Sequence, residues 1–244
     1  MLFRSSEPAQ AQYTTENHAR QALVETCLKF APLGLNRGKS GNASVRWHRG
    51  LEDGMLITPS GLAYEHTQID DIAWVPLAQP AQGDDAVLQP PGRFDGRRTP
   101  SSEWRMHRDL YQARAHVTGV VHVHSPYATT LACLPAVQAS GIPAFHYMVA
   151  VAGGHDIGCA RYATFGTQAL SDAALEALQG RRACLLANHG QLAVGESLDQ
   201  ALALAVEVEN LSRHYLQAIQ VGEPVLLDSA EMNRVLRPFE RYGR

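Results

Sequence analysis

Segments with the pattern of strands and segments with the pattern of helices follow one another along the whole chain, and this intermixing restricts the fold most. The most regular helical segment begins after Ser197 and continues to about Gln220. Its apolar residues recur at helical spacing and form one stripe: Leu198, Ala201, Leu202, Ala205, Val208 and Leu211. The chain has 244 residues, 45% of them hydrophobic, which is enough for one sizeable core. The sequence therefore predicts a single layered α/β domain without internal repeats.

Capping residues and turns divide this domain into its expected elements. Helices are expected at 14–30, 101–113, 126–134, 171–178, 197–220 and 229–241. The candidate N-terminal caps are Thr14 or Thr15, Ser101 or Ser102, Ser197 and Ser229, while Pro126 is expected to be the first residue of its helix. Strands are expected at 43–47, 55–58, 73–77, 119–125, 144–152, 184–187 and 192–194. Residues 1–13 are expected to form a flexible tail before a domain at 14–244, and residues 79–98, rich in Pro, Gly, Gln and Asp, a long surface loop.

The composition excludes several classes of function. Charged residues make up 18% of the chain and the formal net charge is −3, without a clustered Lys/Arg face, so we expect no nucleic-acid partner. The beginning of the chain lacks the apolar core of a secretory signal, and no window has the length of a membrane span, so we expect a cytoplasmic protein with no membrane partner. The four cysteines are far apart and are expected to be buried free thiols: Cys27, Cys133, Cys159 and Cys184.

Two histidines in the sequence ValValHisValHisSer indicate a metal site. His122 and His124 are two residues apart on a predicted strand, so both project from the same face. A lone strand histidine is most often a core residue, but a pair on one face favours metal ligation. His189 and Glu103 are further candidate ligands, because His189 follows an apolar run and Glu103 begins a predicted helix. Three imidazoles and one carboxylate suit Zn²⁺, or another divalent transition metal.

The remaining histidines lack comparable settings. Six are expected to lie on the surface or near the tail: His18, His48, His66, His107, His116 and His214. His146 is expected to pack beside the site. His155 and Asp156 follow a glycine pair, and either a role in substrate choice or a surface turn fits that pattern.

Seven collinear segments resemble the class II aldolase/adducin family, most closely its L-fuculose-phosphate aldolase branch. These segments are GLNRGKSGNASVR (34–46), MLITPSGLAYE (55–65), PSSEWRMH (100–107), GVVHVHSPYATTLA (119–132), IPAFHYMVAVAGG (142–154), CARYATFGT (159–167) and LLANHGQLAVG (185–195). The resemblance implies a three-layer α/β/α domain around a mostly antiparallel central sheet. It also implies a cyclic homotetramer with active sites at the subunit interfaces.

The same resemblance assigns roles to individual residues. It implies zinc ligation by His122, His124 and His189, with Glu103 as a fourth ligand that becomes the proton-transfer base. Tyr147 matches a general acid that reaches in from a neighbouring subunit, and Tyr242 matches a C-terminal tyrosine that closes the site. The residues that match phosphate contacts are Gly41, Asn42, Ser60, Gly61, Ser101 and Ser102. Lys39 stands where the family commonly has a small hydroxyl residue, and either a phosphate contact or exposure to solvent fits it.

The implied reaction is cleavage of a ketose 1-phosphate to dihydroxyacetone phosphate and an aldehyde, through a metal-stabilised enediolate. The same scaffold also supports ribulose-phosphate 4-epimerases, methylthioribulose-1-phosphate dehydratases and decarboxylases of phosphorylated 3-oxo sugar acids. Glu103 argues against an epimerase, which tends to have Asp there. An adducin-like interaction module without catalysis is a further alternative, but such modules lose the metal ligands that this chain keeps.

Overall fold

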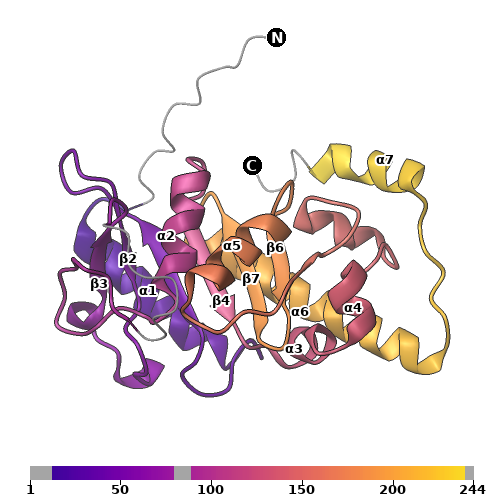
Figure 1. The fold of residues 1–244 in the computed structure, drawn as a ribbon, viewed down its shortest axis with the longest axis horizontal. Coiled ribbons are helices and arrows are strands. Elements are labelled where there is room, and N and C mark those ends of the chain that lie inside the picture. Colours follow the sequence, from indigo (N-terminus) through magenta and orange to yellow (C-terminus); the bar gives the residue numbers. More distant parts are fainter. Residues whose placement is uncertain (1–12, 80–88, 240–244) are drawn as a thin grey trace, which may run out of the picture.

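The computed structural model describes residues 13–79 and 89–239 (Figure 1). The α-helices are α1 (Glu16–Phe30), α2 (Trp104–Ala113), α3 (Pro126–Ala132), α4 (Pro135–Ser140), α5 (Gln168–Ala177), α6 (Leu198–Val221) and α7 (Ser229–Phe239). The strands are β1 (Asn42–Arg46), β2 (Gly54–Ile57), β3 (Ala73–Pro76), β4 (Gly119–Val123), β5 (Cys159–Ala160), β6 (Ala183–Leu186) and β7 (Gly190–Gly195). Short 3₁₀ helices are η1 (Tyr64–His66), η2 (Ile69–Asp71) and η3 (Tyr147–Ala152).

The strands form one sheet in the order β3-β2-β1-β4-β7-β6-β5. All neighbouring pairs are antiparallel except β5 and β6, which confirms the mostly antiparallel sheet. In the pairing of β1 with β4, Asn42 lies opposite His122. Strands from the first and last thirds of the chain therefore meet beside the central strand β4.

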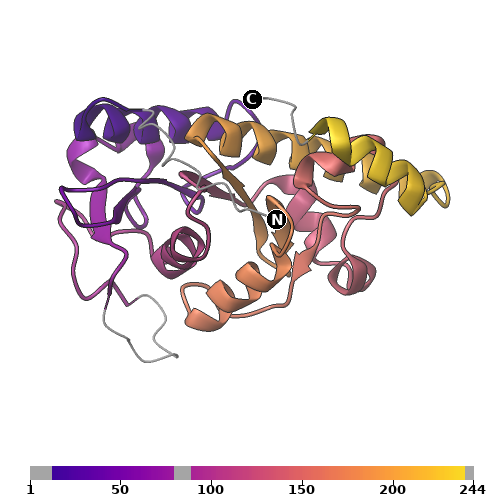
Figure 2. The same ribbon diagram turned by 90° about the horizontal axis from the view of Figure 1, so that it is seen from above.

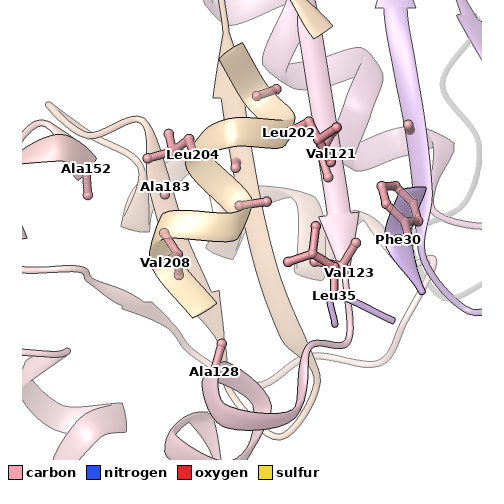
Figure 3. Close-up of a cluster of buried hydrophobic side chains, with 14 of the residues drawn as sticks. Phe30, Leu35, Val121, Val123, Ala128, Ala152, Ala183, Leu202, Leu204 and Val208 are labelled. Carbon is pink, nitrogen blue, oxygen red and sulfur yellow. The ribbon is translucent and has the colours of Figure 1, made fainter. Parts of the chain in front are cut away.

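Helices cover both faces of the sheet, so the predicted three layers are present (Figure 2). On one face α1 and α6 pack against β1, β4 and β7 over a core that includes Val121 and Val123 (Figure 3). On the other face α2 and α5 pack over a second core that includes Val120 and Leu192. Because side chains alternate along a strand, Val121 and Val123 face α6 while His122 faces the layer of α2.

One expected strand is wrong. Residues 144–152 end in the 3₁₀ helix η3 instead, and the His146 side chain accepts a hydrogen bond from the backbone N–H of Met148 at the start of that helix. A short apolar run has no periodicity that separates a strand from a buried helical turn, so its neighbours decide its conformation. Here Val149, Ala150 and Ala152 are buried against the α6 side of the sheet.

Three helices begin at residues other than those expected. Glu103 occupies the N-cap of α2 after Ser101 and Ser102, and Thr167 caps α5 instead of a start at Ser171. At α7 the side chain of Asp228, not Ser229, accepts the N–H of Glu231. Several cap-forming residues stand near each of these starts, and tertiary packing selects among them. The caps Thr15 and Ser197 are confirmed.

Two expectations about burial are also corrected. Cys133 is exposed and Cys159 is half-buried, whereas Cys27 and Cys184 are buried as expected, and all four thiols are free. His107, expected on the surface, is fully buried between α2 and the sheet.

The two segments expected to be irregular are only partly described. Of the expected tail, Tyr13 alone is described, and its ring packs edge-on against His18. Of the loop 79–98, residues 80–88 lie outside the described part, and Asp95 returns to the sheet edge through two backbone hydrogen bonds with Trp74.

Candidate metal centre

Four residues from three separate parts of the chain meet at one end of the central strands. His122 is in β4, His124 follows that strand, His189 is in the turn between β6 and β7, and Glu103 caps α2. One nitrogen or oxygen atom from each residue lies within 4.8 Å of the others. The three imidazole rings are arranged edge to face, with centroids 4.8–4.9 Å apart.

The polar atoms of this group are directed at a common centre. Nε2 of His122 lies 3.0 Å from Nε2 of His124. The Glu103 carboxylate approaches Nε2 of His122 at 3.1 Å and Nε2 of His189 at 3.2 Å. Such spacings are compatible with four ligands around one small cation at ordinary zinc–ligand distances.

Hydrogen bonds and burial show that these residues fit a metal ion. Nδ1 of His122 donates to the backbone carbonyl of Gln191 at 2.9 Å, so neutral His122 presents the lone pair of Nε2 to the centre. Oε1 of Glu103 is buried and makes no hydrogen bond, although a buried carboxylate oxygen normally has a partner. A cation between the imidazoles would satisfy this oxygen, and nitrogen and oxygen donors of this kind suit Zn²⁺.

The ionisation of the group also suits a cation. Burial alone would raise the pKa of Glu103, but His122 and His189 together hold it well below its ordinary value. Burial would likewise lower the pKa of His122, but the Glu103 carboxylate raises it, so this carboxylate stabilises positive charge at the centre. Burial and the neighbouring His122 and His189 lower the pKa of His124 to about 3, so this imidazole stays neutral near pH 7 and keeps a lone pair for a metal.

A cavity of about 550 Å³ opens beside the centre, and Glu103, His124 and His189 form part of its wall. All six residues predicted to bind phosphate line it: Gly41, Asn42, Ser60, Gly61, Ser101 and Ser102. The backbone N–H groups of Ser60 and Ser101 donate to the carbonyls of Thr99 and Thr58, so the hydroxyls of these serines are the donors left for a ligand. Gly61 has a φ of +65°, which favours glycine at this turn.

Close packing restricts one wall of the cavity. A Cβ on Gly41 would lie 2.9 Å from the backbone oxygen of His122, so only glycine fits between this loop and β4. The Asn42 side chain donates from Nδ2 to Glu103 at 2.8 Å, which ties the loop to the candidate ligand. An amide carries two N–H groups, and the other one is a candidate donor to a ligand.

Sequence reasoning missed several residues of this site. Tyr162 and Phe165 line the cavity and are 62% and 45% exposed, so they present aromatic surface to a ligand. They belong to one of the family-like segments, and that membership was the only signal for them. His107 lies behind the cavity and contacts Asn42, a position that no local pattern indicated.

Most of the remaining residues that the sequence predicted for the site do not line this cavity in the described part of the chain. Tyr147 is 51% exposed and is not among the described residues that line the cavity, and Tyr242 lies outside the described part of the chain. His155 contacts Asn233 of α7, and Asp156 pairs with Arg181, so both have contacts away from the cavity. Lys39 lines the cavity.

Comparison with known proteins decides the family. A family model described as "Class II Aldolase and Adducin N-terminal domain" matches residues 21–216. The chain belongs to the class II aldolase/adducin family. The named aldolases among its relatives make this class II aldolase an enzyme, a lyase.

Two curated relatives and one solved structure illustrate the similarity. A 5-methylthioribulose-1-phosphate/5-deoxyribulose-1-phosphate aldolase of Rhodospirillum rubrum is 46% identical, over 92% of this class II aldolase and 92% of the relative. An L-fuculose phosphate aldolase of Escherichia coli strain K12 is 41% identical, over 93% of this class II aldolase and 96% of the relative. A solved L-fuculose 1-phosphate aldolase superposes with a TM-score of 0.79 at 38% identity. The superposition covers 91% of this class II aldolase and 96% of the solved chain. None of the described helices of this class II aldolase is long and apolar enough to span a membrane.

Proposed function

We propose that this class II aldolase uses zinc to cleave a ketose 1-phosphate into dihydroxyacetone phosphate and an aldehyde. The observation that carries the proposal is the convergence of Glu103, His122, His124 and His189 within 4.8 Å, at the wall of a cavity. His122, His124 and His189 would hold the ion, with Glu103 as the fourth ligand. A divalent ion bound there supplies a Lewis acid for the negative charge that develops when a carbon–carbon bond next to a carbonyl breaks.

The chain's own groups supply the proton transfers. In the direction of condensation, the Glu103 carboxylate takes a proton from the carbon of dihydroxyacetone phosphate that forms the new bond. Tyr147 donates a proton to the oxygen of the aldehyde. Tyr147 is half-exposed and does not line the cavity of its own chain, which supports its action in the site of a neighbouring subunit. We therefore include a homotetramer with active sites at its interfaces in the proposal.

The phosphate end of the substrate is assigned to the loops that line the cavity beside the candidate ligands. Ser60, Ser101 and Ser102 supply hydroxyl donors, and Gly61 allows close approach of the backbone to an anion. Lys39 is the lysine on this wall of the cavity, and its ammonium group would strengthen the attraction for a phosphate dianion.

The other end of the substrate is assigned to apolar surface. Tyr162, Ala163 and Phe165 line the cavity and offer aromatic and methyl groups without a charge. A substrate that ends in a methyl or methylthio group buries apolar surface there, whereas a terminal hydroxyl would lose hydrogen bonds to water. We therefore propose 5-deoxyribulose 1-phosphate and 5-methylthioribulose 1-phosphate as preferred substrates, which the similarity to the Rhodospirillum rubrum aldolase supports.

A product-resolved assay of the zinc-loaded protein tests this proposal. We would supply 5-methylthioribulose, 5-deoxyribulose, fuculose and ribulose 1-phosphates, together with a phosphorylated 3-oxo sugar acid, in parallel and identify the products by mass spectrometry. The expected result is dihydroxyacetone phosphate from the first three, with lower kcat/KM for ribulose 1-phosphate, the control that carries a terminal hydroxyl. Loss of water would instead indicate a dehydratase and a mass-neutral change an epimerase. Loss of CO₂ from the phosphorylated oxo-acid would indicate a decarboxylase. An absence of turnover with every substrate would indicate an interaction module.

A further inference from the structure

A continuous chain of hydrogen bonds leads from Glu103 into the interior of the protein. Oε2 of Glu103 accepts from Nδ2 of Asn42 at 2.8 Å, and Oδ1 of Asn42 lies 2.6 Å from Nε2 of His107. Nδ1 of His107 lies 2.7 Å from Oγ of Ser44, which is 2.8 Å from the hydroxyl of Tyr111. All five side chains are at most 5% exposed. This chain of hydrogen bonds therefore runs from the cavity wall to the core beneath α2 through buried side chains.

The chemistry of the groups fixes the direction of every hydrogen bond in this chain. Ionised Glu103 only accepts, so the Asn42 amide nitrogen must face it and the Asn42 oxygen must face His107. Nε2 of His107 must then carry the hydrogen. Burial, and to a smaller extent His122, lowers the pKa of His107 to about 3, so its Nδ1 is an acceptor. Ser44 therefore donates to His107 and accepts from the hydroxyl of Tyr111.

The direction of these hydrogen bonds also determines the orientation of the Glu103 carboxylate. Asn42 on β1 could rotate its amide by half a turn, and its oxygen would then face Glu103 and repel it. The N–H of His107 prevents this, because only the amide oxygen accepts it. The Asn42 hydrogen bond is confined to Oε2, and Oε1 is left without one and faces the centre between the imidazoles.

We propose that His107 is a positioning residue that acts through Asn42 to hold the Glu103 carboxylate in its orientation at the metal centre. The inference rests on the proposed function for its effect on turnover, because there Glu103 is both ligand and base. Its effect on the metal site is independent of which substrate the enzyme uses. Ser44 and Tyr111 contribute to the same positioning, because their hydrogen bonds hold the His107 imidazole in place.

Two amide substitutions separate positioning from packing. In His107→Gln the amide nitrogen takes the place of Nε2 and still donates to Asn42. In His107→Asn the amide takes the place of Nδ1 and reaches only Ser44. We would measure zinc affinity, the absorption spectrum of the Co²⁺-substituted protein, and kcat and KM separately. For His107→Asn we expect an altered Co²⁺ spectrum and a loss of about 10–100-fold in zinc affinity and kcat, as for other partners of metal ligands, with KM unchanged. For His107→Gln we expect values near the wild type.

Smaller changes keep the inference testable if His107→Asn does not fold. Ser44→Ala and Tyr111→Phe each remove one hydroxyl, and the effect on the Co²⁺ spectrum and kcat should be larger for Ser44→Ala, which is nearer to Glu103. Equal values for both amide variants, or a wild-type spectrum throughout, would overturn the positioning role. If no substrate is turned over but the spectrum follows the expected order, the proposed reaction fails while the positioning role stands.

Discussion

Among the histidines, burial and bonding partners determine chemistry at the scale of single residues. His66 is exposed on a short 3₁₀ helix, whereas His107 is fully buried and bonded on both ring nitrogens. His122 is also fully buried, but its Nε2 faces two further imidazoles and a carboxylate. The same side chain therefore serves as a surface group, a hydrogen-bond link and a candidate ligand.

Removal of one imidazole tests the candidate ligands. In His124→Ala the centre loses one of its three nitrogen donors. Loss of a residue that only hydrogen-bonds to a metal ligand lowers metal affinity by about 10–100-fold, and we expect a larger decrease here. Turnover should fall with metal content. Metal analysis after dialysis, with His66→Ala as the matched control, measures the first effect. Full activity of the metal-free protein would contradict the mechanism.

His107 also predicts how stability depends on pH. The unfolded chain protonates this histidine below about pH 6.5, whereas the folded chain, with its pKa lowered to about 3, does not. The unfolded state therefore binds more protons in this window, and the free energy of unfolding decreases as the pH falls, by up to about 1.4 kcal/mol per pH unit from this group. His107→Gln should reduce that slope, relative to the wild type, in urea unfolding of the metal-free protein. An unchanged slope would show that His107 is protonated in the fold.

At the scale of elements, the turn between β6 and β7 determines where His189 lies. Asn188 has a φ of 54°, the left-handed conformation that asparagine tolerates better than most residues. Its N–H donates to the carbonyl of Ala132, and its side chain accepts from Gln138. The strained residue is thus held by α3 and α4, next to the candidate ligand.

Gly190, the first residue of β7 after this turn, allows the close approach of β7 to the end of β4. A Cβ there would lie 2.5 Å from the carbonyl oxygen of Val123 and 3.0 Å from Cδ2 of His124. We expect Gly190→Ala to destabilise the fold by about 1–3 kcal/mol, the usual range for overpacking, and to weaken metal binding because His124 must move. Chemical denaturation and metal titration measure these effects. Gly222→Ala is the control, since a Cβ at that position meets no described atom within 4 Å.

At the scale of the whole molecule, the proposed role of Tyr147 requires it to reach an active site in the assembly. It lies on η3, half-exposed, with its ring 4.8 Å from that of His146. A large exposed aromatic side chain of this kind suits a contact between subunits. The proposed assembly makes each site depend on residues of two chains.

Mixed assemblies test this arrangement. Glu103→Gln and Tyr147→Phe are each expected to lose activity when pure. If the two variants are expressed in equal amounts and assemble at random into cyclic tetramers, roughly a quarter of the sites pair an intact Glu103 with an intact neighbouring Tyr147. Co-expression of the two variants should therefore restore about that fraction of wild-type turnover. An absence of recovery in verified mixed tetramers would place Tyr147 in the site of its own chain.

Local patterns were enough for most of the architecture. The cap at Ser197 and the apolar stripe that follows it defined α6, and the valine alternation around His122 defined the two faces of β4. The run at 144–152 was misjudged because burial of Val149 and Ala150 in a 3₁₀ turn needs the same apolar residues as a strand. The start of α5 was misplaced because Thr167 and Ser171 can both cap a helix, and the start of α2 because its N-cap is Glu103, whose side chain makes no capping hydrogen bond.

The spacing of His122 and His124 by itself determined that two imidazoles share one face, since that follows from the geometry of any strand. The local settings of His189 and Glu103 made them further candidates, and the family resemblance implied that both are ligands. Only the tertiary structure decided that these four side chains converge, because β4, the β6–β7 turn and the start of α2 meet through sheet pairing and helix packing. It also placed His107 behind Glu103, a contact made across 65 residues of sequence to Asn42 that no local pattern encodes. Residue spacing fixes direction along one element, whereas the distance between elements depends on how the whole chain packs.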